Sequence, residues 1–406
     1  MAEFSPEIAL KYAVDLSRPR FVGTPAEAAT AAALTETLTR FGYAVRAEPF
    51  SFSTAVNVAV IGQVAVCLGL VALTLAARGL HPAAPALPAG LLLLGLAAFN
   101  PVLRSAEAGA LIRPPGEAQS AWIRLGRRFT TRNLVAELPG QPPDPARPHL
   151  ILMAHYDSKR QRLPILVRLG LIVTALGGSL ACAGLALLAV AWPPAAEAAL
   201  AAGVIALAAG LPLLGLDWLD GSPGAIDNAS GVGLVLHLAE CLARRPGLSA
   251  ALRWTILLTS AEELALMGAA AFAERHGPAL REAAEAGGLA VLNFDGVGVD
   301  GALYYDDREG AEANPLTRRV LQAAQAAGQP LRRFGLPGVL FDHIPFARRG
   351  LPAVTVLAVG PATWAVHTPA DTADKLHARG FAQAGAVALR VVEALAQGRT
   401  WPSSSI

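Results

Sequence analysis

HLILMAHYDS, at residues 149–158, is the segment from which the architecture can be predicted. It begins as a short apolar run typical of a buried β-strand and ends in polar residues. Alternate residues of an extended segment face the same side, so His155 and Asp157 are expected to point into one site. One of them could bind a metal ion while the other orients it, although a buried His–Asp pair can also be purely structural.

Similar strands recur along the chain and alternate with helical patterns. Strands are expected at residues 43–52, 133–138, 149–154, 253–259, 289–294 and 353–359, and helices at 26–40, 230–245, 266–276 and 381–396. This alternation predicts an α/β fold, a three-layer sandwich with helices on both faces of a mostly parallel central sheet. Ligands of such sheets bind at the carboxyl ends of the strands.

The overall composition is unusually apolar for an α/β enzyme. Of the 406 residues, 53% are hydrophobic and only 16% are charged, whereas a soluble domain carries about 25% charged residues. A disordered chain is excluded, and so is a disulfide scaffold, because only three cysteines are present and they lie far apart. The net charge of +2 gives no reason to expect a nucleic-acid partner.

The apolar excess is concentrated in four runs, Val58–Ala77, Ala83–Phe99, Leu169–Trp192 and Ala198–Leu216. A helix that crosses a membrane needs about 20 such residues. The alternative is a set of buried core helices, which normally keep a polar face. The runs form two hairpins, and we expect an integral, multi-pass membrane protein in contact with the lipid bilayer. The predicted segments are hairpin 1 at 55–104, hairpin 2 at 166–217, and one discontinuous α/β domain at 1–54, 105–165 and 218–406.

The flanking charges predict the membrane orientation. Each hairpin leaves and re-enters the same side, so all polar segments share one side. The flanks on that side carry basic residues, namely Arg104, Arg113, Lys159, Arg160, Arg162 and Arg168, while the two opposite turns carry only Arg78. Because basic flanks remain inside the cell, the α/β domain is expected in the cytoplasm.

Further polar residues follow the predicted strands or precede a helix. Asp227 of DNASG lies just before a helix, where it could be an N-cap or a metal ligand. Glu262 and Glu263 follow WTILLTS. They could occupy a solvated loop, or one could bind a metal while the other acts as a general base. Asp295 follows LAVLNF, and His367 begins HTPADT.

These residues fit a site for two zinc ions. One ion would take His155, Asp227 and Asp295, and the other Asp227, Glu263 and His367, so that Asp227 bridges. Each zinc then keeps an open position, as catalytic zinc sites need. The three carboxylates and one hydroxide would balance the charge of two Zn²⁺ ions.

HYDS, DNASG, SAEE, LNFD and HTPADT together resemble the motifs of the co-catalytic zinc aminopeptidases. This family also contains glutamate carboxypeptidases, glutaminyl cyclases and transferrin receptors. The resemblance implies hydrolysis of N-terminal peptide bonds by a water that two zinc ions share, with Glu262 as the general base and Asp157 beside it. The segment DHIPF also matches a family motif, which implies that Asp342 and His343 contact the substrate or support residues that do.

Three alternatives stay open. HYDSK, and DHIPF followed by Arg348, are also similar to glutaminyl cyclases, but those enzymes typically use one zinc ion, replace DNASG, and carry a tryptophan where this chain has Val366. A non-catalytic module like the transferrin receptor loses ligands, and this chain keeps all five. A transporter would need ionisable residues within its apolar runs, where this chain has almost none.

The chain departs from the family pattern at hairpin 2, which is inserted between Asp157 and Asp227. Because both hairpins must leave the domain at one face, we expect the rim of the active site to lie at the bilayer surface. Apolar or membrane-delivered peptides are therefore the expected substrates. The sequence does not indicate an oligomeric state.

Overall fold

The computed structural model describes residues 4–114, 116–140, 147–249, 251–286, 288–310, 314–336 and 338–397. The chain forms two compact units. The first, here called the α/β unit, comprises Met1–Phe50, Thr130–Arg160 and Leu219–Ile406. The second, here called the helical unit, comprises Ser51–Phe129 and Gln161–Trp218.

A nine-stranded sheet has the order β2-β1-β3-β5-β4-β6-β9-β7-β8. Its strands are β1 (Ala44–Ser53), β2 (Leu111–Ile112), β3 (Arg128–Glu137), β4 (His149–His155), β5 (Arg253–Thr259), β6 (Leu289–Asp295), β7 (Ala302–Asp306), β8 (Arg332–Arg333) and β9 (Ala353–Val359). The middle strands β5, β4, β6 and β9 are parallel, whereas β3 and β7 pair antiparallel with β5 and β9. The sheet is therefore mixed, with the predicted parallel arrangement at its centre.

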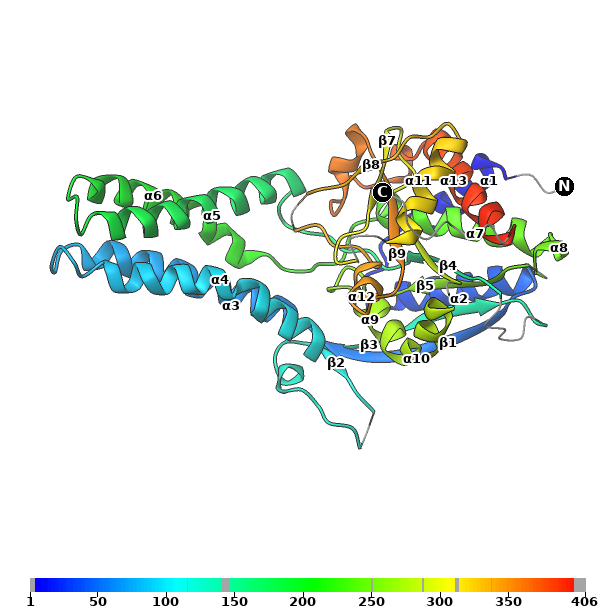
Figure 1. Ribbon diagram of the computed structural model, residues 1–406, viewed down its shortest axis with the longest axis horizontal. Coiled ribbons are helices and arrows are strands. Elements are labelled where there is room, and N and C mark those ends of the chain that lie inside the picture. Colours follow the sequence, from blue (N-terminus) through cyan, green and yellow to red (C-terminus); the bar gives the residue numbers. More distant parts are fainter. Residues whose placement is uncertain are drawn as a thin grey trace. The chain divides into compact units, whose positions relative to one another are not determined.

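Helices cover both faces of this sheet (Figure 1). One face packs against α1 (Pro6–Leu16), α2 (Pro25–Arg40), α7 (Ser230–Ala243), α11 (Pro315–Ala326) and α13 (Ala378–Ala396). The other packs against α9 (Met267–Arg275), α10 (Gly277–Glu285) and α12 (Ile344–Ala347). Leu152 of β4 lies in the first core and its neighbours Ile151 and Met153 in the second, because successive side chains of a strand point to opposite faces.

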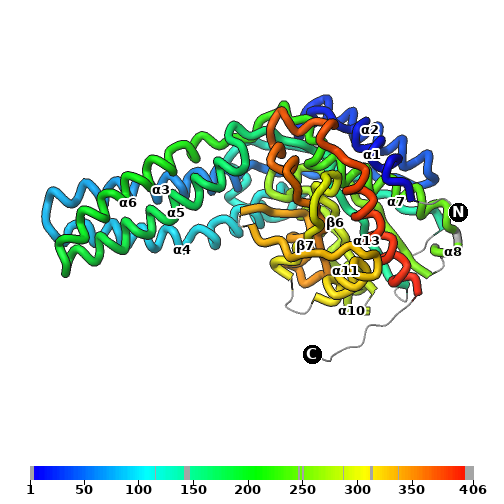
Figure 2. The backbone as a smooth tube through the Cα atoms, turned by 90° about the horizontal axis from the view of Figure 1, so that it is seen from above, coloured from blue at the N-terminus to red at the C-terminus, as the bar shows by residue number. Residues whose placement is uncertain are grey.

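Four long helices build the helical unit. They are α3 (Ala55–Ala77), α4 (Ala86–Gly109), α5 (Ile165–Leu188) and α6 (Ala195–Gly210), and a short 3₁₀ turn (Leu211–Gly215) extends α6. They run side by side as two antiparallel hairpins (Figure 2). Each is long and apolar enough to cross a membrane. The four apolar runs of the sequence lie on these helices, and α4 continues beyond its run through Pro101 to Gly109.

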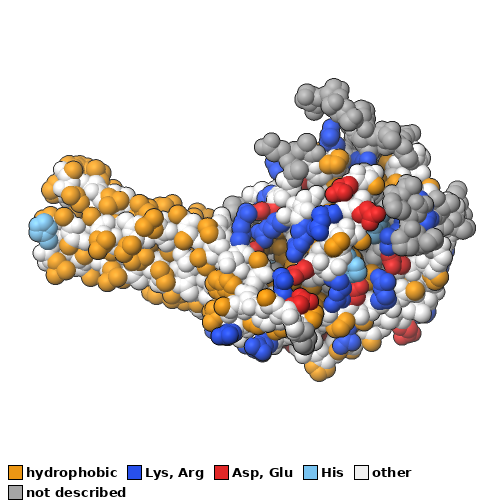
Figure 3. Space-filling model, turned by 60° about the horizontal axis from the view of Figure 1, so that its bottom comes forward, with side chains coloured by type: hydrophobic (Ala, Val, Ile, Leu, Met, Phe, Trp, Pro, Cys, Tyr) orange, Lys and Arg blue, Asp and Glu red, His pale blue; other side chains and the backbone are white. Residues whose placement is uncertain are grey.

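The helical unit exposes large apolar side chains. Large side chains such as Leu73, Leu94 and Val173 are 58%, 67% and 70% exposed, and apolar side chains dominate the visible surface of the bundle (Figure 3). Small residues fill the interior. A Cβ atom added at Gly178 of α5 would lie 3.0 Å from the carbonyl oxygen of Ala202 on α6, so these two helices pack with their backbones in close approach.

Candidate metal centre

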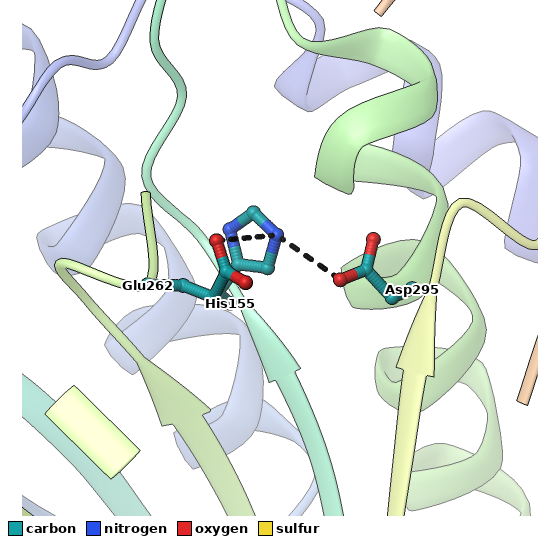
Figure 4. A group of neighbouring side chains, drawn as sticks. All are labelled: His155, Glu262 and Asp295. Carbon is teal, nitrogen blue, oxygen red and sulfur yellow. Dashed lines mark ion pairs between the residues drawn. The ribbon is translucent and has the colours of Figure 1, made fainter. Parts of the chain in front are cut away.

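The predicted ligands meet where the central strands end. His155 is the last residue of β4 and Asp295 the last of β6. Glu262 follows β5, close beside His155 and Asp295 (Figure 4). These three residues offer ligand atoms within 4.8 Å of one another. The carboxyl ends of parallel strands share one edge of a sheet, which explains why residues so distant in sequence converge here.

A second group of three contains Asp227, Glu263 and His367, again with ligand atoms within 4.8 Å. Asp227 connects it to the first group. Its Oδ1 lies 3.0 Å from Nε2 of His155, and its Oδ2 lies 3.0 Å from Nε2 of His367. The same His367 atom lies 3.0 Å from Oε2 of Glu263. One carboxylate therefore faces both histidines, as a bridging ligand would.

The carboxylates of this site are buried close together, which is unfavourable without a cation. Burial, followed by the charges of Glu263, Asp295 and Asp342, raises the pKa of Glu262 well above its ordinary value. Burial and Asp227 likewise raise the pKa of Asp295. A divalent cation would remove this repulsion.

The donor set fits zinc. Within the described part of the chain, neither ring nitrogen of His155 or His367 has a hydrogen-bond partner, although both rings are in contact with carboxylates. Imidazole nitrogen and carboxylate oxygen are ordinary zinc ligands. His155, Asp295 and Asp227 would hold one ion, and Glu263, His367 and Asp227 a second.

Asp157 contacts His155 and the turn that carries Glu262 and Glu263. Its Oδ1 lies 3.4 Å from Nδ1 of His155, and its two oxygens accept hydrogen bonds from the backbone N–H groups of Glu262 and Glu263. It thus orients the ring of His155 and the Glu262–Glu263 turn together. Asp157 is completely buried, as an orienting carboxylate should be.

Asp227 belongs to a distorted turn, Ala225–Ala229, that leads into α7. It does not cap that helix, because the N–H of Gly231 donates instead to Oδ1 of Asn228. The backbone N–H groups of Ile226 and Asp227 donate to the carboxylate of Asp371. The side chain of Asp227 is thereby left to face the two histidines.

Glu262 and Glu263 are buried rather than in a solvated loop. Nζ of Lys159 lies 2.8 Å from Oε2 of Glu263 and also donates to the Glu263 carbonyl oxygen. The preceding residue, Ala261, has a left-handed φ of 59°. Non-glycine residues adopt this conformation only where their surroundings enforce it, which is common at active sites.

Comparison with protein families assigns this chain. The model of Peptidase family M28 matches residues 133–392, which is more than half of the sequence and includes all five candidate ligands. The chain belongs to peptidase family M28. A search of the curated proteins found no match.

Solved structures share the M28 fold over nearly the whole chain. The zinc aminopeptidase of Bacillus subtilis is 15% identical with a TM-score of 0.55, covering 97% of this chain and 95% of that one. The glutaminyl cyclase of Porphyromonas gingivalis is 16% identical with a TM-score of 0.54, covering 96% and 98%. A Zn-dependent exopeptidase of Parabacteroides distasonis is 15% identical with a TM-score of 0.53, covering 96% and 98%. Membership of family M28, together with the two groups of candidate ligands, implies zinc as the metal.

Asp342 and His343 of this M28 chain are completely buried. Asp342 accepts a hydrogen bond from the hydroxyl of Thr259, and burial raises the pKa of Asp342 to about 7. Nδ1 of His343 lies 2.8 Å from the hydroxyl of Thr355, its Nε2 lies 3.2 Å from the carbonyl oxygen of Arg308, and burial lowers its pKa to about 4. Of the two roles expected from sequence, these contacts fit support of neighbouring residues and offer no surface to a substrate.

Three buried residues near the M28 site did not emerge from the sequence. Asp371 lies within the HTPADT motif but was assigned no role there. Glu27 accepts hydrogen bonds from Ser260, next to the Glu262 turn, and from Thr131. Arg20 contacts the segments that carry His155 and Asp227. Asp371 could have been found from its motif, whereas Arg20 and Glu27 carry no local signal because their partners are distant in sequence.

Proposed function

We propose that this chain is a membrane-anchored zinc metallopeptidase that acts as an aminopeptidase on N-terminal peptide bonds. The observation that carries this proposal is the double contact of Asp227 with His155 and His367. A shared carboxylate between two three-residue groups supports a centre of two zinc ions. All five candidate ligands are present, which disfavours a non-catalytic module of the transferrin-receptor type.

Zinc ions bound here would polarise the scissile carbonyl group and lower the pKa of the attacking water. Glu262 lies beside the ligands without being needed as one, so its carboxylate can take a proton from that water and deliver it to the leaving amine. Asp157 keeps the Glu262 backbone in place.

Glu262→Gln tests the proposal, because glutamine keeps the shape of the side chain but cannot take the proton. Hydrolysis of aminoacyl anilides should fall by about 10²- to 10⁴-fold, while metal analysis finds the wild-type zinc content. Glu282→Gln, at an exposed position of α10, is the matched control. Wild-type turnover by Glu262→Gln would rule out the assigned base.

Glutaminyl cyclisation is the second candidate, because solved glutaminyl cyclases share this fold. The two activities differ in metal content and product. Two zinc ions per chain and release of N-terminal residues support the peptidase. One zinc ion per chain, with pyroglutamyl formation from glutaminyl peptides, would support the cyclase instead of the peptidase.

The helical unit supports membrane anchoring. Its helices expose large apolar side chains along their length. Charged residues lie at their ends, such as Arg78 and Glu197, which form an ion pair of 2.8 Å between the turn after α3 and the start of α6. Basic residues are more numerous at the opposite ends, which include Arg113, Arg124 and Arg162, and this asymmetry supports a cytoplasmic α/β unit.

Cysteine labelling in cells tests this orientation. The native residues Cys67, Cys182 and Cys241 are buried, so an introduced cysteine should dominate the signal. A membrane-impermeant maleimide should label His81→Cys, in the turn between α3 and α4, in intact cells. It should label Arg113→Cys only after permeabilisation. The reverse pattern would place the α/β unit outside.

Apolar or membrane-delivered peptides are the proposed substrate class. The chain leaves the α/β unit at Arg160, five residues after His155, and returns at Leu219, eight residues before Asp227. Replacing both helix pairs by short linkers should therefore reduce cleavage of apolar peptides embedded in vesicles more than cleavage of soluble anilides. Equal effects on both substrates would contradict this substrate class.

A further inference from the structure

Arg20 is a fully buried arginine in the α/β unit, between α1 and α2. Within the part of the chain that the structure describes, its guanidinium donates to backbone carbonyl oxygens alone. Nε donates to Tyr156 (2.7 Å), Nη2 donates to Gly224 (2.8 Å), and Nη1 donates to Pro223 (2.6 Å) as well as to two residues of its own segment. A buried arginine therefore connects two chain segments that are far apart in sequence.

These two segments carry the ligands that meet at the centre of the site. Tyr156 lies between His155 and Asp157, while Pro223 and Gly224 open the turn that presents Asp227. They also flank the inserted helix pair, which begins after Arg160 and ends before Leu219. Because α5 and α6 lie between these two segments in the sequence, contacts across the ends of the insertion determine how the segments are placed relative to each other.

Further hydrogen bonds join the two segments near the ends of the inserted helix pair. The backbones of Arg160 and Leu219 exchange two hydrogen bonds, of 2.7 and 3.0 Å. The hydroxyl of Ser158 donates to the carbonyl oxygen of Ser222 and accepts from the backbone N–H of Arg20. These bonds join residues 158–160 to residues 219–222, and the Arg20 side chain extends the contact to the carbonyl groups of Pro223 and Gly224, immediately before the Asp227 turn.

The Asp227 turn is held from two sides. The carbonyl groups of Pro223 and Gly224, just before the turn, accept from Arg20, while the N–H groups of Ile226 and Asp227 donate to Asp371. Gly224 has a φ of +57°, and a Cβ atom there would lie 2.6 Å from the carbonyl oxygen of Asp227 and 3.2 Å from Nη2 of Arg20. The turn is thus packed tightly against the guanidinium group.

We propose that Arg20 is a positioning residue. It holds the segment of Asp227 beside the segment of His155, at the ends of the inserted α5–α6 helix pair, so that the bridging carboxylate is in place before zinc binds. This inference rests on the metal centre of the proposed function. The planar guanidinium of Arg20 donates to carbonyl groups of both segments. A lysine has one ammonium group with three donors and cannot span the same set.

Zinc binding by the full-length protein in detergent tests this role without any peptide substrate. Arg20→Lys keeps the charge, Arg20→Met removes it, and Arg18→Lys, at an exposed arginine of the same segment, is the matched control. In competition with a chromogenic chelator, both Arg20 variants should bind zinc about 10- to 100-fold more weakly. Arg20→Met should be the weaker of the two, and the control should match the wild type.

Cobalt substitution separates positioning from a general loss of stability. The visible spectrum of bound Co²⁺ depends on ligand geometry, so Arg20→Lys should change it at temperatures where the variant is fully folded by circular dichroism. Hydrogen exchange in the zinc-free protein should be faster at residues 221–229 and unchanged in β9. If Arg20→Met does not fold, Arg20→Lys decides alone.

Wild-type zinc affinity and a wild-type cobalt spectrum in the folded Arg20 variants would overturn the inference. That result would not contradict the proposed function, because peptide hydrolysis by the wild type is measured separately. Conversely, a wild-type protein that binds zinc but hydrolyses no peptide would contradict the proposed function while the comparison of zinc affinities still decides the role of Arg20.

Discussion

Oδ1 of Asp227 lies 3.0 Å from Nε2 of His155, although all of α5 and α6 separates the two residues in the sequence. The insertion does not disturb the site because its two ends are joined beside it, at Arg160 and Leu219. A chain of family M28 can therefore carry a pair of long apolar helices between two candidate ligands of one metal centre.

Asp227→Asn should affect both metal positions, because Asp227 faces His155 through one oxygen and His367 through the other. Asparagine has a single carbonyl oxygen and no charge. We expect fewer than two zinc ions per chain by mass spectrometry and a loss of activity greater than about 100-fold, the upper range for residues that only support ligands. Asp220→Asn, at an exposed residue, should retain two ions. Two zinc ions bound per chain of Asp227→Asn would contradict a bridging role of Asp227.

Removal of zinc should destabilise the protein as well as inactivate it, because the buried carboxylates of Glu262 and Asp295 then lose the positive charge of the cation, whereas Glu263 keeps its ion pair with Lys159. At a free zinc concentration of 1,000 times Kd, a single site stabilises by about 4 kcal/mol. Thermal unfolding in detergent should show a lower Tm after chelation, and added zinc should restore it. An unchanged Tm would mean that the ordered site does not depend on a cation.

Gly178→Ile should separate α5 from α6, because a Cβ at Gly178 already lies 3.0 Å from backbone atoms of α6. Overpacking of this kind costs about 1–3 kcal/mol. The neighbouring Gly177 is exposed, and a Cβ there meets nothing within 4 Å. Gly177→Ile is therefore the control, and unfolding in detergent should distinguish the two. Equal stability of the two variants would show that α5 and α6 are not packed closely at this position.

His149 should make the protein sensitive to mild acid. Burial, together with the charge of Arg253, lowers the pKa of His149 to about 3 in the folded state, whereas an unfolded histidine titrates near 6.5. Between about pH 6.5 and 3 the unfolded chain binds a proton that the folded chain does not. The free energy of unfolding therefore decreases as the pH falls, by about 2 kcal/mol at pH 5.

His149→Asn removes this proton while keeping a polar partner for Thr255. Urea unfolding of the zinc-loaded protein should show a smaller loss of stability from pH 7 to pH 5 in this variant than in the wild type. His81→Asn, at an exposed position in the turn between α3 and α4, should retain the wild-type loss. If His149→Asn loses as much as the wild type, the acid sensitivity has another source.

Local patterns account for the parts of the fold that sequence predicts well. The buried strand that ends at His155 and the four long apolar helices are encoded by runs of neighbouring residues, so their positions follow from periodicity and hydropathy. The edges of the sheet were less predictable. β7 pairs antiparallel with β9, and no property of Ala302–Asp306 alone indicates its partner or its direction.

The candidate ligands were also accessible to sequence analysis, because each lies in a short motif directly after a strand or before a helix. Their residue types and order indicated zinc chemistry before any distance was known. The amino-acid sequence by itself therefore determined the central strands, the long apolar helices and the residue types that meet at the ends of the strands.

Only the tertiary structure decided how these residues are held. The contact of Arg20 with Tyr156 and Gly224, and that of Asp371 with the Asp227 turn, join segments that are remote along the chain. Such contacts form only when the folded backbone brings these segments together, and no local sequence pattern indicates them. For the same reason the orientation of Asp227 toward both histidines, instead of toward the helix that follows it, became evident only in three dimensions.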